Sequence, residues 1–383
     1  MRVLYVSKAS RVAAHRDKVA ALSRHVDVTL VVPERWGRAP LEAWDEGPRP
    51  LTLPALLHGH NHFHLYRGLG GVLVPGAYDL VHIDEEPHSL VTAQFALRSM
   101  RLGVPSLFFA WQNLEKRLPP PFGTVRRAVF GAVSGGLAGT ETAARVLRRA
   151  GYVGPLAVVP QMGVDPGRFR PSAEDRGDVR TVLSLPDDAL VVGFAGRLAP
   201  EKGVDVLLAA LARVPVARAL VIGEGPERAA LEARAIESDI AKRVRFVGAV
   251  PSLEMPRWLA ALDVLVLPSR STRGWQEQFG RVLVEAMACE VPVVGSDSGE
   301  IGRVIGAAGC LVPEGDVGAL AATLRELAED AGLREHLGSK GRARVLELYT
   351  QERVARDTVA FYERILGGAR AEPASVRAAE GVV

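Results

Sequence analysis

Cysteine is almost absent from this sequence, which has only Cys289 and Cys310 among 383 residues. Two cysteines can build neither a disulfide framework nor a cysteine-rich metal site. This scarcity fits a protein of the reducing cytoplasm.

Long apolar runs are also absent, since none approaches the roughly 18 residues that a membrane-spanning helix requires. The strand-like start, MRVLYV, lacks the charged leader, apolar stretch and small-residue cleavage site of a signal peptide. We therefore expect a cytoplasmic protein without a membrane-spanning segment.

The net charge is only +3, but it is unevenly distributed. Residues 1–170 contain 21 Lys and Arg against 13 Asp and Glu, whereas the remainder contains 26 against 31. The basic half, and the segment 114–130 (LEKRLPPPFGTVRRAVF) in particular, could contact anionic lipids at the inner membrane face or an anionic acceptor. A solvated helix face in an arginine-rich protein explains the same pattern more simply. Nucleic acid is not an expected partner, because no recognised binding motif accompanies the charge.

Short β-branched runs alternate with helical patterns along the whole chain, which is typical of βαβ units around a parallel sheet. In the first half we predict strands at 3–6, 26–32, 80–83, 106–109 and 156–159. In the second half we predict strands at 190–195, 219–222, 244–247, 264–267 and 291–294, followed by helices near 319–328, 333–349 and 352–365.

The stretch 160–178, rich in proline, glycine and charge, separates the two series of strands and reads as a linker. The pattern predicts an α/β protein of two doubly wound domains, residues 1–165 and 166–350, facing each other across a cleft. Ligands bind in open α/β sheets at the carboxyl ends of the strands, so the cleft is where chemistry is expected. A helix at 351–366 should return to the first domain, and 367–383 should form a flexible tail.

The clearest candidate loop is GFAGRLAPEKGVDVLLAAL, in which an apolar strand ends at Gly196 and a helix begins near Gly203. Arg197 and Lys202 lie between them, so two cations and the N–H groups of a helix start favour a diphosphate at one point. A purely structural loop could contain both cations by chance. The similar GEGP turn at Gly223 is weak alone, and a tight turn explains it.

The run EQFGRVLVEAMA places two acids eight residues apart. Glu285 falls in a helix and could accept hydrogen bonds from a ribose diol, because a buried carboxylate is costly without a partner. Glu277 precedes that helix, and the backbone amides of Phe279 and Gly280 could hold sugar hydroxyls or a phosphate oxygen. The helical period predicts an inward face made of Val282, Leu283, Ala286 and Met287.

Taken together, GRLAPEKG, GEGP, VLPSRSTRGWQEQFGRVLVEAMA and PVVGSDSGEI resemble the retaining glycosyltransferase family 4, whose members have the GT-B architecture of two facing Rossmann-like domains. The resemblance covers nearly all of the second half. It implies that the first domain binds the acceptor and the second the nucleotide sugar. By position, Arg197 and Lys202 would bind the donor diphosphate, and Glu285 would contact the donor ribose.

The resemblance also implies catalytic and donor-binding groups. Glu277 would lie near the transferred sugar and act with the two cations, while Gly196, Gly223, Phe279 and Gly280 complete the donor site. Transfer would proceed with retention and without metal or cofactor, because the cations can neutralise the leaving diphosphate. The donor would be a UDP-, GDP- or ADP-sugar, and the acceptor a hydroxyl of a saccharide, a lipid or a small molecule.

The first half departs from the family. The loop SKASRVAAHRDK lacks the paired glycines that often follow the first strand, and Ser7, Lys8 and Arg11 could substitute for them. The family often has a histidine where this chain has FFAWQN. The acceptor-side candidates are therefore His82, Asp84, Trp111, Gln112 and Asn113. Glu85 and Glu86 could join them, or could simply begin an exposed acidic helix.

The segment HGHNHFHLY contains His58, His60, His62 and His64, which would share one face of a strand. These imidazoles have no carboxylate or cysteine at a recognised metal-ligand spacing. A strand beside the acceptor site is therefore favoured over a metal site.

Two other functions remain open, a sugar-nucleotide epimerase and a non-catalytic binding protein, whereas a glycosidase is disfavoured. A glycosidase also uses two carboxylates, but it does not need the adjacent Arg-Lys loop. A GT-B sugar-nucleotide epimerase would share the donor site, and a non-catalytic protein could bind a sugar nucleotide without turning it over.

Overall fold

The computed structural model describes residues 1–12, 15–37, 41–43, 47–186 and 189–371. The chain forms two compact units. Unit 1 comprises Met1–Gln161 and the chain from Gln351 onward, and unit 2 comprises Met162–Thr350. The polypeptide therefore passes from unit 1 to unit 2 and then back again.

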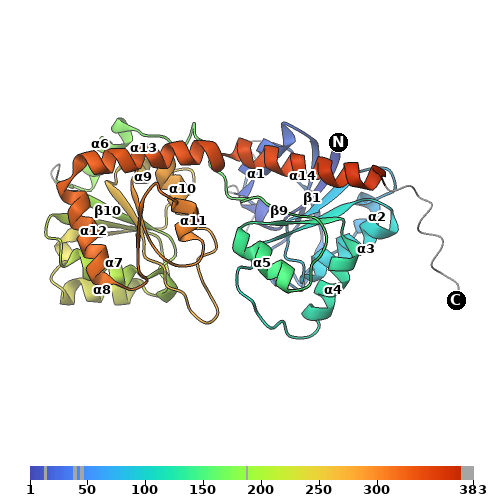
Figure 1. The fold of residues 1–383 in the computed structure, drawn as a ribbon, viewed down its shortest axis with the longest axis horizontal. Coiled ribbons are helices and arrows are strands. Elements are labelled where there is room, and N and C mark those ends of the chain that lie inside the picture. The colour runs from blue at the N-terminus through green and yellow to red at the C-terminus, as the bar shows by residue number, and fades with distance from the viewer. Residues whose placement is uncertain (13–14, 38–40, 44–46, 187–188, 372–383) are drawn as a thin grey trace. The chain divides into compact units, whose positions relative to one another are not determined.

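Unit 1 contains a seven-stranded parallel sheet with the strand order β3-β2-β1-β6-β7-β8-β9 (Figure 1). The strands are β1 (Arg2–Val6), β2 (Asp27–Pro33), β3 (Leu51–Leu53), β6 (Leu80–Ile83), β7 (Ser106–Ala110), β8 (Gly135–Ala138) and β9 (Leu156–Val158). The helices are α1 (Asp17–Ser23), α2 (Leu69–Val72), α3 (Leu90–Arg101), α4 (Phe122–Ala132), α5 (Glu141–Arg149) and α14 (Gln351–Ala371). A small antiparallel pair, β4 (Ala55–Leu56) and β5 (Leu65–Tyr66), lies apart from this sheet.

The sheet of unit 1 is covered on both faces, because successive strand residues point to opposite sides. Tyr5 of β1 belongs to an apolar cluster that includes Phe361 of α14. Its neighbour Leu4 belongs to a second cluster, with Phe95 of α3. The helix at the end of the described chain thus completes the core of the unit in which the chain begins.

Unit 2 contains a six-stranded parallel sheet with the order β12-β11-β10-β13-β14-β15. The strands are β10 (Leu190–Ala195), β11 (Ala217–Ile222), β12 (Val244–Gly248), β13 (Val264–Leu267), β14 (Val293–Ser296) and β15 (Cys310–Val312). The helices are α6 (Ala173–Val182), α7 (Val204–Leu211), α8 (Arg228–Glu237), α9 (Met255–Ala260), α10 (Arg281–Ala288), α11 (Ile301–Ile305), α12 (Val317–Glu329) and α13 (Ala331–Leu348).

The two doubly wound parallel sheets confirm the predicted α/β class, but three strands of these sheets were missed, namely β3, β8 and β15. The sequence of β8, GGLA, has low intrinsic strand propensity because of its glycines. Gly136 is required there because a Cβ atom would lie 2.5 Å from the ring of Phe108. The short strand β15 was missed as well.

Two other predictions need correction. Residues 57–64 form turns between β4 and β5, so the histidines of this segment are not on a strand. Helix α14 continues to Ala371, beyond the predicted end and into the predicted tail. The rest of that tail, 372–383, lies outside the described residues. Across the described residues, no helix combines the length and apolar character needed to cross a membrane.

Candidate active site

The site in unit 2 lies where the strand order of the sheet changes direction. Strand β10 comes first in the chain and lies between β11 and β13, so the connections after β10 and β13 leave towards opposite sides. Such a switch point, at the carboxyl edge of an open α/β sheet, is where ligands bind. The loops 196–203 and 268–280 flank it.

Glycines allow these loops to approach one another closely. Gly203 has a φ of +66°, and a Cβ atom there would lie 2.0 Å from the carbonyl oxygen of Pro268. A Cβ atom on Gly223 would lie 1.9 Å from the carbonyl oxygen of Gly196. The GEGP turn therefore supports the loop after β10, which places Gly196 and Gly223 side by side.

The central contact of the site joins Lys202 to Glu277. The ammonium nitrogen lies 2.6 Å from Glu277 Oε2, and the hydroxyl of Ser269 donates to the same oxygen at 2.9 Å. Glu277 is only 7% exposed, and the Trp275 ring centroid is 4.8 Å from the Lys202 nitrogen. An ammonium has three donors, so Lys202 can keep Glu277 and still bind a phosphate oxygen.

Glu285 lies on α10 and is 8% exposed. Its Oε1 atom is 2.7 Å from Nε of Arg281, one turn earlier. Burial raises the pKa of Glu285, and the Arg281 cation opposes that shift. The rest of the helix packs as predicted except for Val282, which is half-buried.

The other donor-side candidates have distinct environments. Arg197 is exposed, and its side chain makes no ion pair or hydrogen bond with any residue in the described ranges. The Phe279 ring is buried against Tyr349, with centroids 5.6 Å apart. Gly280 has a φ of +76° and precedes the first residue of α10. The structure thus joins Lys202 to Glu277, while Glu285 is paired separately.

Ser269 and Trp275 were missed as site residues. Ser269 is the second residue after β13, as Arg197 is the second residue after β10, and this position could have identified it. Trp275 carries no such signal, because its place over Lys202 depends on the turn at Thr272, whose hydroxyl accepts the Trp275 N–H at 3.0 Å.

Unit 1 has its own switch point, between β1 and β6. Asp84 Oδ2, just after β6, accepts hydrogen bonds from Ser7 Oγ and from Lys18 Nζ, both at 2.7 Å. Lys8 forms an ion pair with Glu85, and its backbone N–H donates to the same carboxylate at 3.3 Å. The loops after β1 and β6 are therefore joined by charged contacts.

Burial perturbs the acids of this edge. Burial raises the pKa of Glu85 to about 7, and the Lys8 cation opposes the shift. Burial also raises the pKa of Glu86 to about 7, although Glu86 accepts the backbone N–H groups of Trp111 at 2.8 Å and Gln112 at 3.0 Å. An exposed helix start does not describe Glu85, because its side chain is buried.

Two candidates of unit 1 lie in its interior. His82 is fully buried, and its Nδ1 is 2.5 Å from the Tyr362 hydroxyl oxygen. Burial lowers the pKa of His82 to about 3, so the ring is neutral at physiological pH. Arg11 is buried and donates to the carbonyl oxygens of Pro33 and Glu34 at 2.5 and 2.8 Å. Both residues therefore have structural contacts rather than a free face for an acceptor.

The histidine segment contributes polar and ring contacts to the same edge. His62 contacts the Ser89 hydroxyl at 3.0 Å, and its ring lies 4.5 Å from that of His88. The buried His64 ring packs edge-on against Trp36, and its Nε2 is 4.0 Å from a Glu85 oxygen. No group of three or more potential ligands among the described residues could hold a metal ion.

Comparisons with known proteins agree with this geometry. The family model "Glycosyl transferases group 1" matches residues 175–344. A D-inositol 3-phosphate glycosyltransferase of Streptomyces bingchenggensis is 32% identical over 410 residues, covering 97% of this chain and 86% of that protein. A GDP-mannose-dependent monoacylated α-(1-6)-phosphatidylinositol monomannoside mannosyltransferase of Corynebacterium glutamicum is 37% identical over 48% of this chain and 50% of its own length.

Solved structures share the fold. Sucrose-phosphate synthase from Thermosynechococcus elongatus superposes with a TM-score of 0.76 at 21% identity, covering 96% of this chain and 100% of that one. The structure of Anabaena HepE in complex with UDP superposes with a TM-score of 0.76 at 19% identity, and the match covers 95% of this chain and 100% of that one. Since a relative at 32% identity spans almost the whole chain, the protein belongs to the group 1 glycosyl transferases, enzymes of the family 4 type with the GT-B fold.

Proposed function

We propose that this enzyme moves a sugar from a nucleotide-diphosphate sugar to an acceptor hydroxyl, with retention of configuration and without a metal. The donor binds to unit 2, and the acceptor binds to unit 1. The observation that carries the proposal is the contact of Lys202 with Glu277 at the switch point of the second sheet.

The chemistry of the donor site follows from its charges. Arg197 and Lys202 face the diphosphate and stabilise the negative charge that grows on it as the sugar leaves. Glu285 accepts the ribose hydroxyls, and its buried position favours such a partner. Glu277 lies near the transferred sugar and orients both it and Lys202.

The same arrangement supports metal independence, and the family resemblance supports retention. Two cations stabilise the negative charge on the leaving diphosphate, as a divalent metal ion would. The acceptor hydroxyl attacks from the face that the nucleotide leaves, and a departing phosphate oxygen accepts its proton. No protein base is then required for the transfer.

The acceptor is bound at the carboxyl edge of the first sheet. Asp84 and Glu85 lie at that edge with Lys8, and the segment 111–113 begins beside Glu86. A saccharide or polyol acceptor suits these donors and acceptors of hydrogen bonds. The names of the relatives, which include an inositol phosphate and a phosphatidylinositol mannoside enzyme, support such an acceptor, free or on a lipid at the inner membrane face. The two free cysteines support a place in the cytoplasm.

Product analysis tests this function. The enzyme is incubated with UDP-, GDP- or ADP-sugars and a set of saccharide, polyol and lipid acceptors, with and without a chelator. We expect a new glycoside whose anomeric configuration by NMR matches that of the donor, formed equally well with chelator. Conversion of donor without any acceptor would indicate an epimerase, and donor binding without turnover would indicate a sensor.

A further inference from the structure

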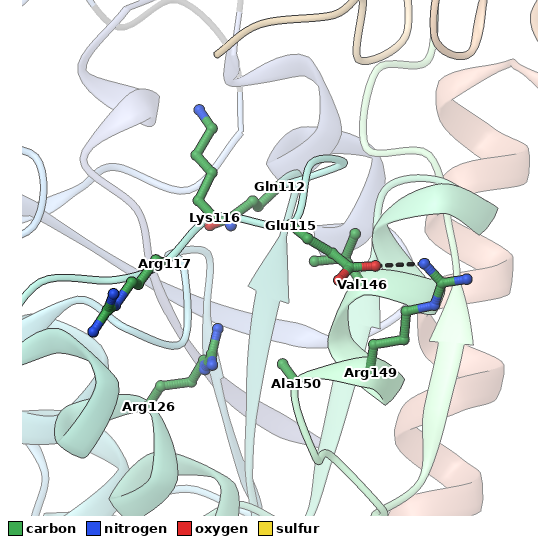
Figure 2. A pocket seen from close by; sticks show the side chains of 8 residues that line it. All are labelled: Gln112, Glu115, Lys116, Arg117, Arg126, Val146, Arg149 and Ala150. Atoms are coloured by element: carbon green, nitrogen blue, oxygen red, sulfur yellow. Dashed lines mark hydrogen bonds and ion pairs between the residues drawn. The ribbon is translucent and has the colours of Figure 1, made fainter. Parts of the chain in front are cut away.

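A basic pocket of about 240 Å³ lies in unit 1 between the loop after β7 and the helices α4 and α5 (Figure 2). Four cations line it, against one acid, Glu115, so the local formal charge is four minus one, or +3. The cations are Lys116, Arg117, Arg126 and Arg149. Neither the donor site nor the contacts at the edge of the first sheet involve these charged groups.

Most of this charge has no acidic partner among the described residues. Of the four cations, Arg149 is the one with such a partner there, Glu115 at 2.5 Å, drawn as the dashed line in Figure 2. Within the part of the chain that the structure describes, the side chains of Lys116, Arg117 and Arg126 make no ion pair or hydrogen bond. Like charges that line one pocket repel one another, and an anion between them would offset that repulsion.

Arg126 carries the strongest signal for a ligand. Its Nε atom is buried and has no hydrogen-bond partner among the described residues. Burial and the neighbouring Arg127 lower the pKa of Arg126, and its guanidinium carbon lies 6.0 Å from the Phe130 ring centroid. A buried donor without a hydrogen-bond partner is costly, and an anion in the pocket would satisfy it. In Figure 2 its side chain rises from α4 towards the loop of Gln112 and Arg117.

The pocket is connected to the acceptor edge through Gln112. The side chain of Gln112 lines the pocket, and its backbone N–H donates to Glu86 at 3.0 Å. A ligand held at Arg126 can therefore place its other end near the segment 111–113. The volume has room for about eight waters at ~30 Å³ each, enough for a phosphate group and part of a polyol ring.

We propose that this pocket binds a phosphate ester carried by the acceptor, with Arg126 as the main ligand. The guanidinium fork matches phosphate oxygens, and two further cations complete the neutralisation. The concave site and the partly buried arginine suit an inserted phosphate group better than a flat charged surface. This inference rests on the proposed function, because it names a part of the acceptor.

Calorimetry on the full chain tests the pocket. The probes are myo-inositol 3-phosphate with myo-inositol as its unphosphorylated control, and vesicles of phosphatidylcholine with and without phosphatidylinositol. We expect R126Q to weaken binding of the phosphorylated probe roughly 10- to 100-fold, since a hydrogen-bonded charge is lost. R126K, which keeps the charge without the fork, should fall between R126Q and the wild type. The matched control is R127Q, because Arg127 is exposed on the same helix and lies outside the pocket.

The outcomes separate the sources of the phosphate. Loss of inositol phosphate binding in R126Q alone supports a small soluble acceptor, and loss of vesicle binding in R126Q alone supports a lipid headgroup. Equal weakening by R126Q and R127Q, or no preference of the wild type for a phosphorylated probe, would overturn the proposal. Thermal melts confirm that the variants fold. Nucleotide binding, measured in parallel, tests the proposed function separately, because the donor residues lie in unit 2.

Discussion

In unit 2 the strand at the switch point, β10, is followed by Gly196 and then by a loop whose close approach to Pro268 requires Gly203. In unit 1 the equivalent strand, β1, is followed by Ser7 and Lys8, whose side chains bind the loop after β6. Each edge contains an ion pair, Lys202 with Glu277 in unit 2 and Lys8 with Glu85 in unit 1. Among the described residues, the edge of unit 2 also exposes glycine backbone and the unpaired cation Arg197, whereas Ser7 and Lys18 add further side-chain contacts to the edge of unit 1.

The same topology therefore provides two kinds of surface. A glycine-lined edge lets an elongated anion approach the backbone, as a diphosphate requires. An edge of paired side chains presents donors and acceptors of hydrogen bonds, as a hydroxylated acceptor requires.

The largest effect is expected for Lys202→Ala. Removing one charge-stabilising group at the leaving diphosphate should lower kcat by ~10²- to 10³-fold. Steady-state assays with saturating donor measure it, and Lys242→Ala, at an exposed position of unit 2, is the control. Near-normal turnover would show that Lys202 does not stabilise the leaving diphosphate.

Glu285→Ala should weaken binding of the nucleoside moiety by roughly 10- to 100-fold, because the ribose loses a charged hydrogen-bond acceptor. Calorimetry with the preferred nucleoside diphosphate measures the change. Glu290→Ala is the control, because Glu290 is exposed just after α10. Unchanged affinity would mean that Glu285 forms its ion pair with Arg281 and does not bind the ribose.

Lys8→Met should raise the acceptor KM or lower kcat with acceptor by roughly 10-fold, or about 1.4 kcal/mol. Nucleotide affinity should stay the same, because Lys8 lies in unit 1. Arg24→Met removes one exposed charge from the same unit as a control. A variant that lost nucleotide affinity instead would contradict the division between the two edges.

A further difference concerns the dependence of stability on pH. The pKa of His82 is about 3 in the folded chain, well below the ordinary value for histidine, because the ring is buried. Between pH 3 and about 6.5, this histidine binds a proton in the unfolded chain but not in the folded chain. The free energy of unfolding therefore decreases as the pH falls through this range, by up to about 1.4 kcal/mol per pH unit.

His82→Asn should remove that part of the pH dependence. As the pH falls, the free energy of unfolding should therefore decrease less in the variant than in the wild type. Urea denaturation at several pH values measures the difference, with exposed His336→Asn as the control. A constant difference between variant and wild type would show that His82 does not titrate in this range.

The motifs of the second half predicted the fold and the position of the loop after β10 because their pattern is local. Strand β10 and the cations that follow it are contiguous in sequence. The contact of Lys202 with Glu277 spans 75 positions, and only the strand order brings the two together. Similarly, the burial of His82 depends on Tyr362 of α14, which no local pattern places beside β6.

The first half was harder to predict because its polar groups are paired across the sheet. Glu85 and Glu86 resemble an exposed helix start in sequence, yet Lys8 and the backbone of 111–112 hold them at the buried edge. The alternating histidines suggested a strand, but the turns of 57–64 override that period.

The most direct test compares the affinity of a nucleoside diphosphate with that of its nucleoside, in the wild type and in the double variant Arg197→Gln with Lys202→Gln. We predict that the diphosphate binds far more tightly to the wild type and that this advantage collapses in the double variant, while nucleoside affinity persists. An undiminished advantage would contradict the donor site described for unit 2.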